Sequence, residues 1–209
     1  MNDKVQTAPP IRYGEIAPRF PEGEASLEQL LPGKGDFEIE LGYGRGAFLL
    51  DRAEVAKDSR IIGIEIKKKL AFFVEKRRND RGLSNARVFG DDARVVLPRI
   101  TDDGGVARFF IHFPDPWWKK RHAHRRILDD VLLDQLARLL RSKGELFVQT
   151  DVEERAQSMV ETLRGRKEFT LAGDERGFVP TNTYGARSNR EARADEDGLP
   201  VYRILAIRT

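Results

Sequence analysis

The stretch Phe37-Glu38-Ile39-Glu40-Leu41-Gly42-Tyr43-Gly44-Arg45-Gly46 decides the fold of this chain of 209 residues. Its first half is a β-rich run, its second half is a turn with three glycines, and a helical pattern begins directly after it. Glycine lets a backbone take positive φ and approach a ligand closely. A strand that runs through such a turn into a helix is typical of a doubly wound α/β sheet, in which the ligand lies at the carboxyl ends of the strands.

Short β-rich runs alternate with helical patterns along the rest of the chain, which predicts an α/β fold with a mostly parallel central sheet and helices on both faces. The expected strands cover residues 37–41, 61–65, 86–89, 108–113, 144–150 and 201–208. The expected helices cover residues 47–56, 67–81, 128–140 and 152–163. We expect residues 1–34 to form an N-terminal arm with little helix. Residues 35–209 are expected to form one domain, with a long polar loop at about 172–200.

Composition and charge limit the possible functions. The chain has 37 Lys and Arg against 34 Asp and Glu, a net charge of +3 and a pI of about 9.2. It has no cysteine and three histidines, so we expect no disulfide and no metal site. It also lacks the apolar core of a signal peptide and any apolar run near the ~20 residues that span a membrane. These features predict a cytoplasmic protein without a membrane segment, and they do not distinguish a monomer from a homodimer.

A carboxylate lies near the end of each of the first three expected strands. Glu40 comes two residues before the first glycine, Glu65 ends the second strand, and Asp92 follows the third. Each acid alone is compatible with an ordinary surface position. Taken in this order, they resemble the S-adenosylmethionine site of a Rossmann-like class I methyltransferase. In such a site Glu40 suits a cationic group, Glu65 the ribose hydroxyls and Asp92 the adenine amino group.

The spacing of the glycines helps to choose between ligands. Gly42, Gly44 and Gly46 form a G-x-G-x-G pattern, whereas a dinucleotide-binding turn prefers G-x-G-x-x-G. A nicotinamide-dependent enzyme is therefore the less favoured interpretation. An ordinary tight turn without a ligand is the other alternative for these glycines.

The most distinctive motif is Phe113-Pro114-Asp115-Pro116-Trp117-Trp118, which the basic run 119–126 follows directly. The two prolines fix φ on both sides of Asp115 and hold its carboxylate on a stiff loop. An acid, two indoles and a basic run in one loop can hydrogen-bond a base edge, stack on a base and contact phosphates, as recognition of unpaired RNA requires. The alternatives are a structural corner with packed indoles and a solvated basic face. His112 is expected to be packed or hydrogen-bonded and not catalytic.

Through this loop the chain resembles the bacterial tRNA (guanine-N7-)-methyltransferase family, whose signature reads much like FPDPW-x-KKRH followed by arginines. The resemblance covers about residues 36–165. It implies S-adenosylmethionine as methyl donor, S-adenosylhomocysteine as product, no metal, and the variable-loop guanine at tRNA position 46 as methyl acceptor.

The resemblance also implies roles for individual residues. The implied cofactor-binding residues are Glu40, Gly42, Gly44, Gly46, Glu65, Asp92 and Asp115. Asp115 would also be the catalytic residue at the reaction centre, an acidic side chain that orients the guanine and opposes its developing charge; whether it also accepts a proton is left open by the sequence. Lys119 and Asp151 match substrate-contacting positions of the family, and Trp117 and Arg121 are expected to contact the tRNA beside them.

Near the carboxyl end the family pattern is weaker. Relatives carry a Thr-x-x-Glu element followed closely by Arg, and alignment of Arg187 with that arginine puts Asn182 on the threonine and Gly185 on the glutamate. The carboxylate is then missing from its expected place. Thr183 or a neighbouring threonine is a candidate for the hydroxyl, and Glu191 is a candidate for the carboxylate. Asn182, Thr183 and Arg187 are accordingly assigned to substrate binding.

Two other functions remain open on the sequence. The first is a methyltransferase of the same fold that acts on another RNA or on a small molecule, which the altered carboxyl-terminal element keeps in play. The second is a catalytically silent RNA-binding module, which the presence of Glu40, Glu65, Asp92 and Asp115 disfavours.

Overall fold

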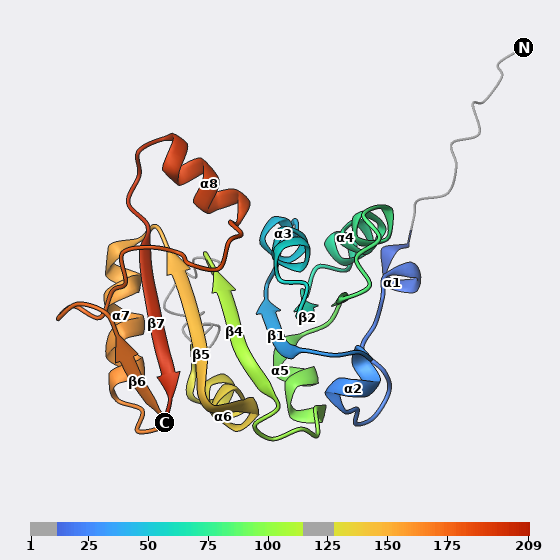
Figure 1. The fold of residues 1–209 in the computed structure, drawn as a ribbon, viewed down its shortest axis with the longest axis horizontal. Coiled ribbons are helices and arrows are strands. Elements are labelled where there is room, and N and C mark those ends of the chain that lie inside the picture. Colours follow the sequence, from blue (N-terminus) through green and yellow to red (C-terminus); the bar gives the residue numbers. More distant parts are fainter. Residues whose placement is uncertain (1–11, 115–127) are drawn as a thin grey trace, which may run out of the picture.

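The computed structural model describes residues 12–114 and 128–209, and a seven-stranded sheet forms its centre (Figure 1). The strand order is β3-β2-β1-β4-β5-β7-β6. The first five strands run parallel, and β7 is antiparallel to both of its neighbours. The strands are β1 (Asp36–Leu41), β2 (Ser59–Ile64), β3 (Ala86–Phe89), β4 (Val106–His112), β5 (Leu140–Thr150), β6 (Phe169–Ala172) and β7 (Tyr202–Arg208). The mostly parallel sheet predicted from the sequence is confirmed.

Helices cover both faces of this sheet, as expected. The helices are α1 (Tyr13–Ile16), α2 (Leu27–Leu30), α3 (Ala47–Val55), α4 (Lys68–Asp80), α5 (Ala93–Val96), η1 (Leu97–Arg99), α6 (Asp130–Leu139), α7 (Glu153–Arg164) and α8 (Asn189–Glu196). One face packs against α3 and α4, and its buried cluster joins side chains such as Leu49 and Val74 to β2 and β3. The other face packs against α2, α5, α6 and α7, with Leu136 and Val160 in the larger cluster.

Strand β1 shows why this sheet forms. Phe37, Ile39 and Leu41 alternate along it and are at most 7% exposed, which places them in the larger apolar cluster. Glu38 and Glu40 point to the opposite face and are also buried, at 0% and 2% exposure. Buried carboxylates are stable only when they are paired or hydrogen-bonded, so this face must supply partners for them.

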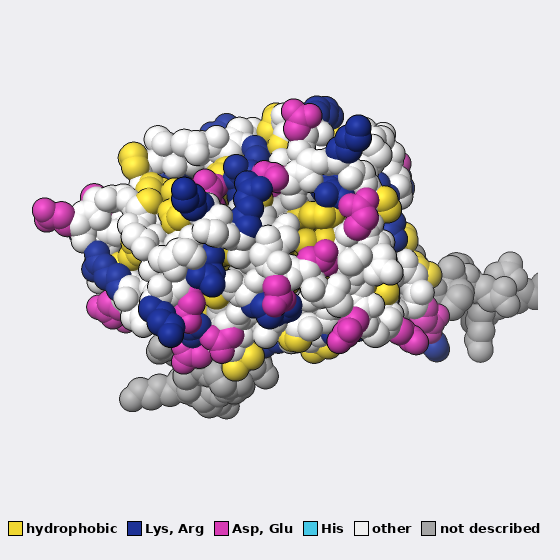
Figure 2. Space-filling view, turned by 60° about the horizontal axis from the view of Figure 1, so that its bottom comes forward, with side chains coloured by type: hydrophobic (Ala, Val, Ile, Leu, Met, Phe, Trp, Pro, Cys, Tyr) yellow, Lys and Arg dark blue, Asp and Glu magenta, His cyan; other side chains and the backbone are white. Residues whose placement is uncertain are grey.

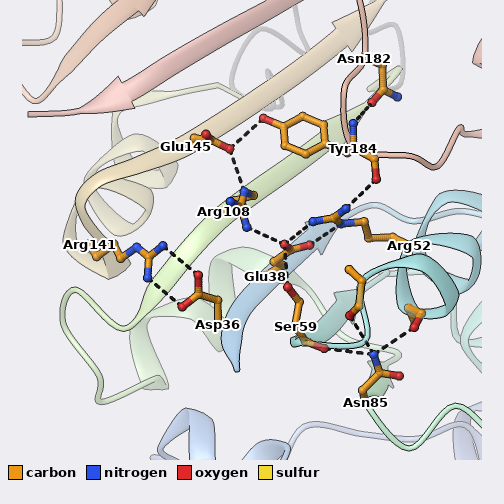
Figure 3. A network of polar contacts seen from close by, with 12 residues as sticks. Asp36, Glu38, Arg52, Ser59, Asn85, Arg108, Arg141, Glu145, Asn182 and Tyr184 are labelled. Atoms are coloured by element: carbon orange, nitrogen blue, oxygen red, sulfur yellow. Dashed lines mark hydrogen bonds and ion pairs between the residues drawn. The ribbon is translucent and has the colours of Figure 1, made fainter. Parts of the chain in front are cut away.

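The segment 173–188, which contains no helix or strand, covers the same face of the sheet next to α3. Its Tyr184 packs edge-on against Phe110 of β4 and Phe147 of β5, with ring centroids 4.8 and 4.9 Å apart. Its hydroxyl donates to Glu145 at 3.0 Å, and its carbonyl accepts from Arg52 at 2.6 Å. These contacts hold the carboxyl-terminal segment over the centre of the sheet (Figure 3).

The pairing of Glu38 continues the same network. Arg52 of α3 donates to both Glu38 oxygens at 2.8 and 2.9 Å, Arg108 of β4 donates at 2.8 Å, and Ser59 donates at 3.2 Å (Figure 3). Arg108 also pairs with Glu145 at 2.8 Å. Two guanidinium groups therefore balance two carboxylates beneath Tyr184, and the buried charge of Glu38 is fully compensated.

Several elements differ from the sequence-based expectation. Strand β4 ends one residue early, at His112, because Phe113 has φ of 47° and leaves the extended conformation. Strand β6 was not expected. The stretch 172–200 was expected to be a loop throughout, yet it contains α8.

The described part of the N-terminal arm packs onto the domain. Its helices α1 and α2 have four residues each, which fits an arm with little helix. Phe20, Leu27 and Leu30 are at most 6% exposed and belong to the larger apolar cluster. Asp91 holds the middle of this segment against the domain, because it accepts from the Phe20 amide at 2.7 Å and pairs with Arg19.

Candidate active site

A cavity of about 840 Å³ lies at the carboxyl ends of the parallel strands and forms the candidate active site. The cavity lies at the topological switch point of the sheet: β2 and β3 follow on one side of β1, and β4 lies on its other side. Doubly wound sheets bind ligands at this position. The lining comes from the ends of β1, β2 and β4, from the turn after β3, and from the start of α8, at residues 41–45, 47–48, 64–67, 70, 91–94, 111–114 and 188–190.

The glycine-rich turn forms one wall of this cavity. Gly42, Gly44 and Gly46 all have positive φ, at 72°, 55° and 71°, which side chains rarely allow. A Cβ at Gly46 would lie 2.7 Å from a methyl group of Val74, so this glycine is also needed for close packing of α4. The turn is therefore shaped both by backbone conformation and by the helix behind it. Gly42 and Gly44 line the cavity, and Gly46 does not.

Glu65 lies beside the turn and is hydrogen-bonded to it. It is 6% exposed, and its two oxygens accept from the Gly44 amide at 3.0 Å and the Lys67 amide at 2.9 Å. A carboxylate has about four acceptor positions, so each oxygen keeps capacity for a ligand hydroxyl. The two amides fix the orientation of the carboxylate at the cavity wall.

Asp91 and Asp92 both line the cavity, but they have different partners. Asp92 caps α5, because its side chain accepts from the Arg94 amide at 2.9 Å. Asp91 is used by Arg19 and Phe20 of the N-terminal segment. Of the two, Asp92 is thus the acid without a bond to the N-terminal segment.

Glu40 and His112 form a buried polar pair at the ends of β1 and β4. Their side chains are 2% and 3% exposed, and His112 Nδ1 lies 2.9 Å from Glu40 Oε1. His112 is packed and hydrogen-bonded, as predicted. His112 lines the cavity, whereas Glu40 lies behind it. Glu40 Oε2 and His112 Nε2 have no hydrogen-bond partner among residues 12–114 and 128–209, so both are candidates for contact with a ligand.

Asp151 lies at the end of β5, on the same rim. It accepts from Arg190 of α8 at 2.8 Å, and both residues line a small second cavity with Phe113 and Pro114. Arg190 and Pro114 also line the large cavity. Asp151 is therefore next to the proposed ligand site, and at present it is paired with a residue of α8.

The three carboxyl-terminal residues that the sequence assigns to substrate binding lie away from the cavity lining. The Asn182 amide donates to Ala186 O and to Glu191 Oε2, each at 2.9 Å, so it is used within the segment. Arg187 is 61% exposed and pairs with Asp195 at 3.1 Å. Asn182, Thr183 and Arg187 are absent from the lining of both cavities, although Thr183 is exposed.

Sequence reasoning missed the residues of this segment that do reach the large cavity, Ser188 and Arg190 among them. Ser188 caps α8 and accepts from the Glu191 amide at 3.2 Å. Ser188, Glu191 and Arg193 have the spacing of the family element, in which a hydroxyl residue is followed three positions later by Glu and then closely by Arg. Alignment on Arg187 does not give this match. The capping-box pattern was the available signal. Glu191 is 1% exposed and is held by Gln149, Asn182 and Arg203.

Four predicted site residues, Asp115, Trp117, Lys119 and Arg121, lie outside the described residues. Asp115 follows Pro114, which lines both cavities, so the chain enters that loop from the rim of the site. Within residues 12–114 and 128–209, no group of three or more His, Asp or Glu is placed to hold a metal ion. No helix in the same part of the chain is long and apolar enough to cross a membrane.

Acidic and basic side chains are interspersed on the face shown in Figure 2. Many described cations are paired with acids, as Arg141 is with Asp36 and Arg81 with Asp51, both pairs at 2.8 to 2.9 Å. Such pairs leave little net positive charge for a polyanion. The basic run 119–126 therefore stays the main candidate for phosphate contacts.

Comparisons with known proteins agree with this arrangement. The sequence profile of a family described as "putative methyltransferase" matches residues 35–204. A tRNA (guanine-N(7)-)-methyltransferase of Anaeromyxobacter dehalogenans is 37% identical over 174 residues, which cover 83% of this chain and 86% of that protein. One of Prochlorococcus marinus is 31% identical over 175 residues, covering 81% of each. The aminoglycoside resistance methyltransferase NpmB1 has a similar structure, with TM-score 0.59, 22% identity and coverage of 88% and 92%.

The sheet order and the structural likeness define a Rossmann-like class I fold, and the family profile over residues 35–204 makes the chain a methyltransferase. This confirms the fold class and the enzyme class predicted from the sequence. At 31 to 37% identity over about four fifths of its length, the chain belongs to the tRNA (guanine-N(7)-)-methyltransferase family.

Proposed function

We propose that this protein transfers a methyl group from S-adenosylmethionine to N7 of the variable-loop guanine, position 46, of tRNA in the cytoplasm. The observation that carries the proposal is that the glycine turn, Glu65 and Asp92 all line one cavity. Phe113 and Pro114, which begin the signature loop, line the same cavity. Family membership gives the substrate class. The aromatic and basic composition of residues 117–126 supports an RNA substrate.

The residues of the cavity fit S-adenosylmethionine. Gly42 and Gly44 give it a close backbone wall, with Gly46 supporting the turn from behind. Glu65 has free acceptor capacity for two ribose hydroxyls, and Asp92 for an amino group. The unpartnered Glu40 Oε2 suits a cationic group, because a buried carboxylate oxygen without a donor is costly. When bound, the cofactor supplies an electrophilic methyl group on a sulfonium sulfur, and S-adenosylhomocysteine is left.

The acceptor guanine needs orientation more than deprotonation. Guanine N7 has an in-plane lone pair and no proton at neutral pH, so no strong general base is required. Asp115 is proposed to accept from guanine N1–H and N2–H, which orients the ring and opposes the positive charge that develops on it. Correct orientation of reacting groups is worth about 7 to 11 kcal/mol of barrier lowering.

The tRNA contacts are proposed to come from two segments that meet at the rim. Lys119 and Arg121 would contact phosphates, and Trp117 would stack on a base, which is worth about 1 to 3 kcal/mol. From the other side, Asp151 and the start of α8 border the cavity. Because Ser188 and Asn189 line it, we propose these two residues as substrate contacts in addition to Asn182, Thr183 and Arg187.

Methyl transfer from labelled S-adenosylmethionine to unmodified tRNA transcripts tests the proposal. The expected result is label in 7-methylguanosine, lost in a transcript with adenosine at position 46. Asp115→Asn should lose most turnover even at saturating S-adenosylmethionine, where a change in cofactor affinity has no effect. Label in another nucleoside or another RNA would redirect the substrate assignment. Binding of RNA without any transfer would support a catalytically silent module and contradict the proposal.

A further inference from the structure

His112 is the buried residue whose role the proposed function leaves unassigned. Its ring centroid lies 4.2 Å from that of Phe48 and 6.0 Å from that of Phe110, and its side chain is 3% exposed. Two flanking aromatic rings restrict rotation of the imidazole. The ring therefore presents fixed nitrogen positions, with Nδ1 toward Glu40 and Nε2 on the opposite edge.

The hydrogen bond between these two residues assigns the proton. With Glu40 as a carboxylate, which only accepts, the hydrogen between His112 Nδ1 and Glu40 Oε1, 2.9 Å apart, is assigned to Nδ1. This bond ties one oxygen of Glu40 to strand β4. The other oxygen, Oε2, is buried, and neither it nor His112 Nε2 has a hydrogen-bond partner in the part of the chain that the structure describes. Two unsatisfied polar atoms at the end of adjacent strands are costly in the absence of a ligand.

The strand pairing explains why the two side chains meet. Glu40 of β1 is level with Phe110 of β4, and His112 follows Phe110 by two residues on the same face. His112 therefore sits one step nearer to the carboxyl ends than Glu40, and it lines the cavity while Glu40 lies behind it. The His112 side chain faces the cavity directly, and the other unpartnered atom, Glu40 Oε2, belongs to the residue behind it.

We propose that His112 is a positioning residue for the methyl donor: its Nδ1–H holds Glu40 so that Oε2 accepts from the donor's α-ammonium group. The inference rests on the proposed function, because it requires S-adenosylmethionine in this cavity. It adds a residue that acts through Glu40 on the amino-acid end of the cofactor and leaves the adenosine end to Glu65 and Asp92.

Two probes separate this role from a general structural one. S-adenosylhomocysteine carries the amino-acid part, whereas 5′-methylthioadenosine keeps the adenosine and sulfur and lacks that part. Calorimetric titration of the full chain gives the affinity for each probe. His112→Phe should weaken S-adenosylhomocysteine about tenfold or more, the cost of one hydrogen bond to a charged group, and should leave 5′-methylthioadenosine within about threefold.

Matched variants fix the atom responsible. His112→Asn puts an N–H near the position of Nδ1 and should restore most of the affinity, whereas His112→Gln does not place a donor there and should behave like Phe. Glu40→Gln should show the same selectivity between probes. The double variant His112→Phe/Glu40→Gln should bind no more weakly than Glu40→Gln alone, because the two residues act as one unit. Ser59→Ala, at the amino end of β2, is the control and should leave both affinities unchanged.

The outcomes are distinct. Selective loss in His112→Phe with recovery in His112→Asn supports the proposal. Equal loss for both probes, or no recovery in a folded His112→Asn, overturns it. Selective loss in Glu40→Gln alone also overturns it and leaves the proposed function standing. Failure of the unaltered protein to bind either probe overturns both.

Discussion

Arg190 of α8 donates to the carboxylate of Asp151 at the end of β5, with Nε and one terminal nitrogen each 2.8 Å from Oδ2. The same guanidinium lies 5.6 Å from the centroid of the Phe113 ring. Arg190 borders both cavities, so this contact joins the carboxyl-terminal helix to the strand end that leads into the signature loop. This partly exposed ion pair adds to the buried hydrogen bond from Gln149 of β5 to Glu191 in attaching α8 to the strand.

Arg190→Ala should loosen α8 without destabilising the domain. Arg190 is 53% exposed and Asp151 18%, so the pair is worth less than about 1 kcal/mol of global stability. The amides of 189–196 should nevertheless exchange faster with deuterium, because local opening needs less free energy. The control is Arg193→Ala, which removes an 81% exposed partner of Asp197 within the same helix. Equal exchange rates in the two variants would show that the Arg190–Asp151 contact does not hold α8.

Glu38 should be far more important to stability than its neighbour two residues earlier. Glu38 is fully buried and pairs with Arg52 and Arg108, so Glu38→Gln leaves the Arg52 guanidinium without a counter-charge, and Arg108 keeps only Glu145. The expected loss is about 3 kcal/mol of unfolding free energy, measured by urea denaturation. Asp36→Asn is the matched control, because its partner Arg141 is 47% exposed, and it should cost less than about 1 kcal/mol. Similar losses in both variants would exclude the buried network as a main source of stability.

Tyr184 predicts a pH dependence of stability. Burial, and after it the charge of Glu145, raise the pKa of Tyr184 above its ordinary value. The neutral phenol is therefore favoured in the folded state, and its contribution is complete below the unfolded pKa of about 10 and is lost as pH rises through the folded pKa. Tyr184→Phe removes one hydrogen bond and should cost about 1 kcal/mol near neutral pH. The difference between the variant and the unaltered protein should shrink by about 1 kcal/mol between pH 10 and 11 in guanidinium unfolding. A constant difference would contradict the prediction.

The sequence predicted the centre of the fold because its local signals and its buried pattern agree. Strand β1, its glycine turn and α3 lie within one residue of their expected bounds. The missed elements lack such signals. Helix α8 has the sequence NREARADE and buries only Glu191 and Ala194, so it has no apolar stripe. Strand β6 has four residues at the edge of the sheet, and only pairing with β7 defines it.

The candidate site also has one part that the sequence could predict and one part that it could not. Strand ends of a parallel sheet meet at one edge, so the placement of Glu40, Glu65 and Asp92 could be anticipated from strand order alone. The carboxyl-terminal residues could not, because their positions depend on how a long segment folds back over Phe110 and Phe147. The pairing of His112 with Glu40 likewise needs the register between β1 and β4, which no local pattern contains.

The basic run predicts how tRNA affinity responds to salt. Each phosphate contact releases counterions, so the slope of log affinity against log salt reports the number of such contacts. Lys119→Ala should weaken tRNA binding and reduce that slope by about one, while the affinity for S-adenosylhomocysteine stays unchanged. Lys76→Ala is the control, since Lys76 of α4 is already paired with Asp80 at 2.8 Å and should leave the slope unaltered. Filter binding at several salt concentrations measures both variants. An unaltered slope in Lys119→Ala would place Lys119 away from the phosphates, whereas an equal reduction in Lys76→Ala would mean that α4 also contacts the tRNA backbone.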